Sequence, residues 1–417
     1  MSKINLFLGN CLDVLKTFQD NSFDAIVTDP PYGLSFMGKK WDHSVPSVKI
    51  WEECLRVLKP GGHLLAFAGT RTQHRMAARI EDAGFEIRDM IAWVYGSGFP
   101  KSHDVSKTID KAAGAEREVI GPNRWADRHP NIRGKAVGQN YGTDLNPSRP
   151  VTAPTTDVAR QWQGWGTALK PALEPITVAR KPLVGTVAEN VLAHGTGGIN
   201  VDASRVEAEK TTGWGGDPSN GYSGGLNQDL NARPVQGRWP ANLIHDGSDE
   251  VVGLFPETGK SSGHIRHNKP SLFLNSSGAS LGVADNVGSA ARFFYCAKAN
   301  KSDRNDGLKD MPMQDVHRYN AGIGEGKDPD APSKGQNHHP TVKPTDLMRY
   351  LVTLVTPPNG HVLDPFMGSG STGKACVQKG FTFTGIEMDK DYLEIARRRI
   401  EHEEEKKKQE APLLEGV

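Results

Sequence analysis

The sequence predicts an α/β protein in which the two ends of the chain form one mostly parallel sheet and the middle is inserted between them. Short apolar segments alternate with amphipathic helical patterns at both ends, which is typical of a parallel sheet covered by helices on both faces. Residues 121–340, by contrast, hold well over half of the 46 glycines and 27 prolines. The middle of the chain is therefore expected to be rich in loops.

The size and charge of the chain exclude several classes of protein. Its 417 residues are enough for two or three domains. The 50 Lys and Arg residues nearly balance the 49 Asp and Glu residues, so a nucleic acid would have to be held by a local basic patch. No apolar stretch approaches the ~20 residues of a membrane span, and the four cysteines are too widely spaced for a zinc site. These features predict a cytoplasmic protein that binds neither a membrane nor a metal.

The first part of the chain is expected to alternate strands with helices. The apolar run at residues 23–28 is typical of a short buried strand. The apolar spacing from Trp51 to Leu58 predicts a helix, and the Pro-Gly-Gly sequence that follows predicts its end. Beyond it we expect, in chain order, a strand at 63–67, a helix at 72–83 and a strand at 86–95.

The last part of the chain shows the same alternation. Leu347 and Leu354 belong to an apolar helical stripe that stops at a Pro-Pro-Asn-Gly sequence. We then expect a strand at 361–363, a glycine-rich loop that opens a helix through Lys379, and a strand at 381–386. The highly charged segment 389–409 favours a helix with a solvated face.

The sequence Asp29-Pro30-Pro31-Tyr32 directly follows the strand predicted at 23–28. Ligands of open α/β sheets bind at this carboxyl end of the strands. The Asp29 carboxylate and the Pro30 carbonyl could each accept one hydrogen of a nucleobase amino group and so direct its lone pair at an electrophile, while Tyr32 offers a flat face for the base. Two prolines would hold the acceptors in place. A plain proline-rich turn is the alternative interpretation.

A glycine-rich sequence forms the second candidate element. It runs from Leu363 to Gly373, and its glycines would let a ligand approach the backbone at a helix start. It nearly matches a phosphate-binding loop, but Ala375 stands where a magnesium-binding Ser or Thr is needed. The next strand ends at Glu387, an acidic residue suited to the hydroxyls of a ribose. Together these residues indicate a nucleoside-type cofactor.

The two elements, in this order, resemble those of the β-class amino-methylating DNA methyltransferases. The stretch His339-Pro340-Thr341-Val342-Lys343-Pro344 and the stretch Gly9-Asn10-Cys11-Leu12 are also similar to family motifs, although Asn10 replaces the usual Asp. The resemblance implies a circularly permuted Rossmann-like class I methyltransferase sheet with an inserted loop-rich target-recognition domain. Its two parts would be residues 1–115 and 337–400, with the insertion at 116–336 and a charged tail at 401–417.

The resemblance also implies a cofactor and a set of site residues. The cofactor would be S-adenosyl-L-methionine. Catalysis would rest on Asp29, Pro30, Pro31 and Tyr32. The cofactor would be bound by Asn10, Cys11, Asp29, Thr341, Lys343, Asp364, Phe366, Gly368, Gly370, Ser371, Thr372, Glu387 and Met388.

Double-stranded DNA is the expected partner of the inserted region. Basic residues outnumber acidic ones between Thr258 and Ser302, which favours a track for phosphates. The residues expected to bind DNA are Lys39, Lys40, Lys101, Lys260, Arg266, Lys269, Arg292, Lys298 and Lys301. The resemblance leaves a homodimer open.

The sequence thus predicts a site-specific methyltransferase that acts on the N6 amino group of a flipped adenine in DNA. Within the family, Asp before Pro-Pro-Tyr favours adenine, but the same amine chemistry serves N4 of cytosine. One rival is a DNA-binding regulator that keeps the cofactor fold without catalysis, against which the intact Asp-Pro-Pro-Tyr argues. Another is a methyltransferase for RNA or protein, but the long insertion favours duplex DNA. Methylation of a ring carbon is not expected, because no cysteine follows a proline.

Overall fold

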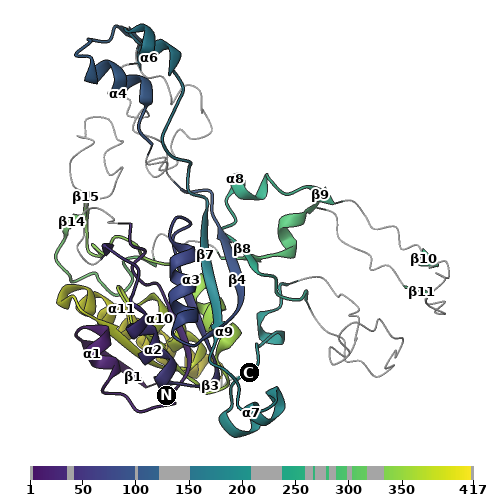
Figure 1. Ribbon diagram of the computed structural model, residues 1–417. Helices are drawn as coiled ribbons and strands as arrows, with labels where there is room; N and C mark the ends of the chain where they lie inside the picture. The colour runs from purple at the N-terminus through teal and green to yellow at the C-terminus, as the bar shows by residue number, and fades with distance from the viewer. Residues whose placement is uncertain are drawn as a thin grey trace.

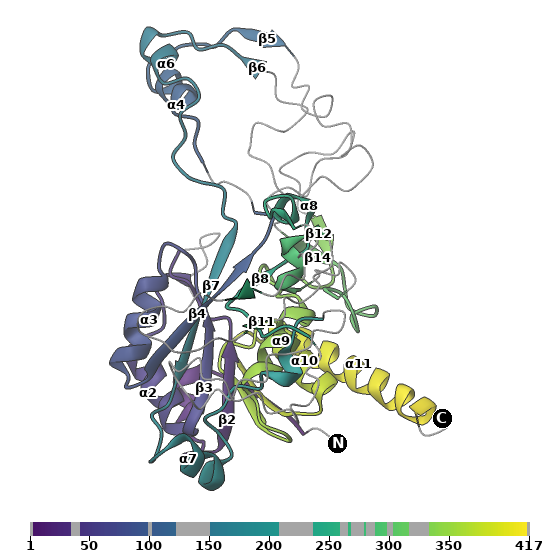
Figure 2. The same cartoon turned by 90° about the vertical axis from the view of Figure 1, so that its right-hand side faces the viewer.

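The fold was analysed in a computed structural model of the chain (Figure 1). The structure describes residues 3–34, 42–98, 102–121, 151–207, 237–258, 266–267, 279–280, 288–297, 303–316 and 333–414. A layered body of sheet and helices contains both ends of the chain, and an arm that carries two short helices projects from it (Figures 1 and 2). In these ranges every helix is too short or too polar to span a bilayer.

One sheet of nine described strands organises the body, in the order β1-β17-β16-β2-β3-β7-β4-β8-β13. The strands are β1 (Ile4–Leu8), β2 (Phe23–Thr28), β3 (Leu58–Phe67), β4 (Glu86–Val94), β7 (Leu173–Arg180), β8 (Leu243–His245), β13 (Tyr295–Cys296), β16 (His361–Asp364) and β17 (Thr382–Glu387). β7 runs antiparallel to both of its neighbours, β3 and β4, and the other pairings are parallel. The neighbouring strands β2, β16 and β17 come from opposite ends of the chain, so the predicted joining of the two ends in one Rossmann-like sheet is confirmed.

Helices cover both faces of this sheet. They are α1 (Cys11–Leu15), α2 (Val48–Val57), α3 (Gln73–Asp82), α9 (Thr345–Val355), α10 (Ser371–Lys379) and α11 (Lys390–Leu414). One apolar core includes Trp51 of α2 and Met76 of α3, and the other includes Leu351 of α9 and Ile400 of α11. These two cores are the two faces of the sheet, because strand residues alternate between them: Ala25 and Val27 lie in one and Ile26 in the other.

The elements predicted for the two ends are confirmed, with one instructive difference. β3 begins at Leu58, so the Pro-Gly-Gly sequence lies inside a strand rather than in a break. Gly61 N–H donates to the carbonyl of Lys181 over 3.1 Å, and Lys181 N–H donates to the carbonyl of Gly62 over 2.9 Å. Backbone pairing with a distant segment thus replaces the turn that local sequence favours. The edge strand β1 was not expected, because its apolar run is short.

Residues between the two ends contribute to the sheet as well. β7, β8 and β13 all lie in the range 116–336 that the sequence predicts as an insertion, yet they pair within the main sheet. β7 pairs with β4 as in a hairpin, and the arm is the connection between the end of β4 at Val94 and the start of β7 at Leu173 (Figure 2). The arm contains α4 (Val105–Ala112), β5 (Val119–Gly121), β6 (Val151–Thr152) and α6 (Asp157–Gln161).

The buried Asp110 holds the arm together. Its carboxylate pairs with Arg117 over 2.6 Å and accepts the backbone N–H groups of Thr155 and Thr156.

The remaining elements are α7 (Val187–His194), η5 (Asp202–Ser204), α8 (Asp249–Val252), β9 (Glu257–Thr258), β10 (Arg266–His267), β11 (Ala279–Ser280), β12 (Gly288–Ser289), η6 (Ala290–Phe293), β14 (Gln314–Val316) and β15 (Ser333–Gly335). Their small size agrees with a loop-rich middle.

Candidate active site

The candidate site lies where three neighbouring parallel strands end. β17 ends at Glu387, β16 ends at Asp364, and β2 ends at Thr28, directly before Asp29. These strands are adjacent in the sheet, so the predicted catalytic turn and the predicted cofactor residues emerge at one edge. The carboxylate of Asp364 accepts a hydrogen bond from the Thr28 hydroxyl over 2.6 Å, which joins the two motifs directly.

Four polar side chains meet at Asp29, and we refer to Asp29, Tyr32, Glu174 and Lys343 as the Asp29 cluster. The Tyr32 hydroxyl lies 2.7 Å from Oδ1 of Asp29, and Nζ of Lys343 lies 2.7 Å from Oδ2. The same two donors also approach Oε2 of Glu174, at 3.0 Å for the hydroxyl and 3.2 Å for Nζ. Two carboxylates therefore share one ammonium group and one phenol.

The electrostatics of the cluster follow from its burial. Burial raises the pKa of Asp29, Lys343 opposes that shift, and the charge on Glu174 adds to it. Burial disfavours the charged form of Lys343, but the two carboxylates outweigh this effect and raise its pKa. Burial, together with Asp29, holds the pKa of Tyr32 well above its usual value. Tyr32 is thus a neutral hydrogen-bond donor, and the cluster can accept further hydrogens from an amino group.

The turn that carries Asp29 is fixed at its far end as well. The carboxylate of the buried Asp42 accepts the N–H groups of Gly33 and Leu34 over 2.9 and 3.2 Å. Gly33 has a φ of +68°, and a Cβ there would lie 2.7 Å from the backbone nitrogen of Val45. Because a side chain at Gly33 would be both strained and crowded, the glycine is needed for the turn to close.

Asp364 holds the glycine-rich loop in shape. Its carboxylate accepts hydrogen bonds from the hydroxyls of Thr28 and Thr372, each over 2.6 Å, and from the N–H of Phe366 over 3.1 Å. Burial raises its pKa to about 6, which these hydrogen bonds oppose. Asp364 and Thr372, which the resemblance places at the cofactor, thus also connect β2, the loop and α10.

The glycine-rich loop has backbone without side chains at its glycines, and the carboxylate of Glu387 lies beside it. Gly368 and Gly370 have φ values of +54° and +79°, and a Cβ at Gly368 would lie 2.8 Å from Nε2 of His339. The N–H of Gly368 donates to Oε2 of Glu387 over 2.9 Å. Burial raises the pKa of Glu387 to about 7. Nδ1 of His339 is buried without a hydrogen-bond partner among the described residues. Backbone without side chains, a carboxylate of the kind that suits ribose hydroxyls and a buried nitrogen with no partner among the described residues fit a nucleoside-type cofactor.

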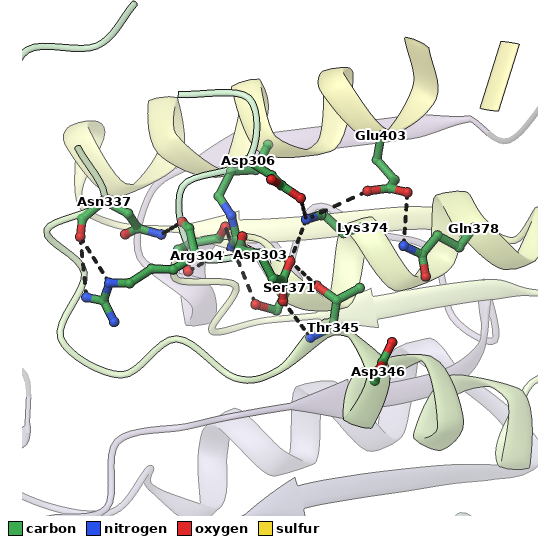
Figure 3. Close-up of polar contacts among 12 residues, drawn as sticks. Asp303, Arg304, Asp306, Asn337, Thr345, Asp346, Ser371, Lys374, Gln378 and Glu403 are labelled. Atoms are coloured by element: carbon green, nitrogen blue, oxygen red, sulfur yellow. Dashed lines mark hydrogen bonds and ion pairs between the residues drawn. The ribbon is translucent and has the colours of Figure 1, made fainter. Parts of the chain in front are cut away.

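Ionic contacts surround Lys374 of α10, the helix that follows the loop (Figure 3). Nζ of Lys374 lies 2.5 Å from Asp303, 3.4 Å from Asp306 and 3.7 Å from Glu403. The side chain of Arg399 donates to the carbonyl of Ser369 inside the loop and to the carbonyl of Asp303. Lys374 and Arg399 are almost completely buried. These contacts connect α10, α11 and the Ser369 carbonyl of the loop to the segment 303–308.

Several predicted cofactor residues have contacts of other kinds. The side chain of Asn10 accepts the N–H of Leu12 over 2.9 Å and so caps α1. Burial raises the pKa of Cys11 to about 11, which keeps the thiol neutral. Ser371 donates to the carbonyl of Lys343 over 2.8 Å. Phe366 packs on the core beside Trp51, whereas Thr341 and Met388 are exposed.

Two contacts of the site were not expected from the sequence. Lys343 was predicted to bind the cofactor, but in the structure its ammonium group pairs with the carboxylates of Asp29 and Glu174. Glu174 was not predicted at all. It is the second residue of β7 and precedes a largely apolar stretch, so a charged residue next to that stretch was the signal that could have revealed it.

The predicted DNA contacts are only partly covered by the structure. Lys39, Lys40, Lys101, Lys260, Lys269, Lys298 and Lys301 lie outside the described residues, and Arg266 is described only as part of β10. The guanidinium of Arg292 donates to the hydroxyl of Thr258 over 2.6 Å and lies 4.5 Å from the ring centre of Phe293. That side chain therefore has a role within the protein, and its contact with DNA stays a prediction.

Curated proteins with similar sequences are methyltransferases. The type II methyltransferase M2.DpnII of Streptococcus pneumoniae is 43% identical over 72 residues, which are 17% of this chain and 27% of that protein. The type II methyltransferase M.HpaI of Haemophilus parainfluenzae is 33% identical over 116 residues, which are 25% of this chain and 36% of that protein. The chain thus spans only about a quarter to a third of the length of these relatives.

Solved structures match over most of the chain at low identity. The complex of M1.HpyAVI with S-adenosylmethionine has a TM-score of 0.38 and 16% identity, and the match covers 95% of this chain and 98% of that one. The cytosine-N4-specific PvuII DNA methyltransferase has a TM-score of 0.42 and 13% identity, with 96% and 86% covered. The DNA methylase family of N6 and N4 enzymes matches residues 23–116 and 248–398, more than half of the chain. The protein therefore belongs to the N6/N4 DNA methylase family.

Proposed function

We propose that the protein is a site-specific DNA methyltransferase that modifies the N6 amino group of an adenine flipped out of double-stranded DNA. One observation carries this proposal: the acidic turn at Asp29 and the glycine-rich loop lie at one sheet edge, joined by the hydrogen bond between Thr28 and Asp364. A base held by the turn and a cofactor held by the loop would therefore lie next to each other.

The cofactor is S-adenosylmethionine, which supplies a methyl group already activated by its sulfonium. In this chain Glu387 is suited to the ribose hydroxyls, and the backbone at Gly368 and Gly370 admits a close ligand. Because the methyl group is activated, the protein needs mainly to position the nucleophile in line with it.

The amino group is held by the turn. One carboxylate oxygen of Asp29 accepts one of its hydrogens, and the carbonyl of Pro30 accepts the other, which directs the nitrogen lone pair at the methyl group. Tyr32 provides a face for the base, and its hydroxyl, held at 2.7 Å from Asp29, fixes the position of that face. Asp at the first position of the turn favours adenine over cytosine.

The proposal is tested by expressing the protein in a host that lacks DNA methylation. We expect N6-methyladenine in the nucleosides of its DNA, detected by mass spectrometry, and one short sequence context in long-read sequencing. N4-methylcytosine instead would show that cytosine is the target, and unmodified DNA would refute the activity.

The variant Asp29→Ala tests the catalytic turn. It removes the acceptor of the amino group, so we expect methylation to fall by about 100-fold or more. Binding of S-adenosylmethionine, measured by calorimetry, should largely survive. The matched control is Asp202→Ala, whose carboxylate is exposed and pairs only with Arg205 among the described residues; it should methylate normally. Activity retained in Asp29→Ala would remove this residue from the mechanism.

A further inference from the structure

Glu174 is a second carboxylate in the Asp29 cluster, and none of the sequence motifs contains it. It lies on the antiparallel strand β7, opposite Trp93 of β4. Its Oε2 lies 3.0 Å from the Tyr32 hydroxyl and 3.2 Å from Nζ of Lys343. The hydroxyl of Tyr95 is also hydrogen-bonded to it. Glu174 is therefore contacted from the turn after β2, from the segment before α9 and from the residue that follows β4.

Both oxygens of Asp29 are occupied before any substrate arrives. Tyr32 lies on Oδ1 and Lys343 on Oδ2, each at 2.7 Å. An amino group that binds Asp29 competes with these donors for the carboxylate, and it weakens or displaces the hydrogen bond of one of them. A buried donor that loses its acceptor costs ~1–3 kcal/mol, and more when it is charged. The displaced donor therefore needs another acceptor close by.

Glu174 is the acceptor within reach of both donors. Nζ of Lys343 is only 0.5 Å farther from Glu174 than from Asp29, and the Tyr32 hydroxyl only 0.3 Å farther, so a small shift of either would transfer its hydrogen bond. We propose that Glu174 is a positioning residue that takes over these hydrogen bonds when the substrate amino group binds Asp29. This inference rests on the proposed function.

The charge balance of the cluster supports this assignment. With Asp29 alone, Lys343 would have a single anionic partner, and a substrate amino group that competes for that carboxylate would weaken the ion pair without compensation. With Glu174 present, two carboxylates share the ammonium, so Lys343 keeps an anionic partner in either arrangement. The other titratable groups that face Glu174 are the phenols of Tyr32 and Tyr95, and burial raises the pKa of both.

The test is Glu174→Gln, with Glu86→Gln as the matched control. Glu86 lies at the opposite end of the same hairpin and pairs with Arg180 of β7 over 2.6 Å, so both variants remove one negative charge next to β7. Both are assayed for methyl transfer to unmethylated genomic DNA from S-adenosylmethionine. We expect kcat of Glu174→Gln to fall at least about 10-fold, KM for S-adenosylmethionine to stay unchanged, and Glu86→Gln to match the wild type.

The pH profile shows whether the charge of Glu174 acts on Asp29, and kcat of the folded enzyme separates positioning from a purely structural role. The charge on Glu174 contributes to the raised pKa of Asp29, so Glu174→Gln should move the acidic limb of the rate profile to lower pH. Glu174→Asp keeps the charge and should restore both the limb and part of the rate. If Glu174 only anchored the fold, its replacement would lower stability, and the kcat of the folded enzyme would stay at the wild-type value.

Two outcomes would overturn the inference. One is a Glu174→Gln enzyme with the kcat of the wild type, and the other is an acidic limb that does not move. If Glu174→Gln does not fold, Tyr95→Phe gives the second readout: it removes one hydrogen bond from Glu174 without a change in charge and should lower kcat. An unchanged kcat there would also count against the inference. Failure of the proposed function is distinct, because the wild-type protein itself would then leave the DNA unmodified.

Discussion

Gly370 shows how much of the glycine-rich loop depends on the backbone of a single residue. Its φ of +79° lies in the left-handed region, which other residues adopt at a cost. A Cβ there would also lie 2.9 Å from Cβ of Ala396 and 3.0 Å from its Cα. The loop can therefore pack against α11 only because this position has no side chain.

Replacement of Gly370 with Ala should consequently damage both stability and cofactor binding. Strain in the left-handed region costs ~1–3 kcal/mol, and the contact with Ala396 adds to it, so we expect a lower free energy of unfolding and weaker binding of S-adenosylmethionine. Chemical denaturation and calorimetry measure the two effects. Gly198→Ala is the control, because no atom lies within 4 Å of the added Cβ. Equal stability of the two variants would contradict the prediction.

Local sequence located most residues of the candidate site but not their partners. Asp29, Asp364 and Glu387 each stand at the end of an apolar strand, so the strand pattern itself indicated one edge. The approach of Lys343 and Glu174 to Asp29 depends on which strands are neighbours and on the reversed direction of β7. That information is not contained in the residues around either position.

At the scale of elements, buried ionic contacts decide how α10 and α11 lie against the sheet. Lys374 of α10 is 1% exposed and lies among three carboxylates, one of them from α11. A buried charge that loses its partner is far more costly than an exposed one. The charged surface of α11 carries pairs such as that of Arg397 with Glu401, which water screens.

Lys374→Met should therefore destabilise the protein by ~3–5 kcal/mol, because it leaves buried carboxylates without their cation. Arg397→Ala, on the solvent side of α11, should cost no more than ~1 kcal/mol. Urea denaturation of both variants measures the difference. Similar losses in the two variants would show that the buried contacts do not organise the helices.

At the scale of the whole molecule, two buried histidines make stability depend on pH. Burial lowers the pKa of His63 to about 4, with Arg180 and Arg88 adding to the shift, and lowers that of His339 to about 3. Below the ordinary pKa of 6.5 the unfolded chain takes up protons that the folded chain does not. These groups thus contribute stability that is complete above pH 6.5 and is lost as the pH falls toward 4 and 3.

Glu387 changes stability in the opposite direction, because its pKa is raised to about 7. As the pH falls from about 7 toward the ordinary value of 4.5, the folded chain takes up this proton first, and stability increases.

The contribution of His63 can be isolated with the variant His63→Gln. A shift from 6.5 to about 4 corresponds to about 3 kcal/mol of unfolding free energy between pH 7 and pH 4. The wild type should therefore lose about that much more stability than the variant over this range, measured by denaturant titration at each pH. If both proteins lose the same amount, the imidazole of His63 is not the group responsible.

The overall architecture was predicted best where elements are long and periodic. The joining of the two chain ends and the helices on both faces followed from such patterns, as in α2 and α9. β8 and β13 have only three and two residues, too few for a periodicity to show. Their place in the sheet depends on contacts across the whole molecule.

The hairpin of β4 and β7 has a consequence for how a protein with this fold can diversify. Its strands pair from Glu86 opposite Arg180 to Val94 opposite Leu173, and the arm begins and ends where that pairing stops (Figure 1). Surface segments tolerate insertion and exchange better than paired strands do. An exchange of the arm during evolution would leave Glu174 and the paired strands in place. It would change only the surface that the arm presents to a binding partner. One catalytic framework could in this way acquire new targets.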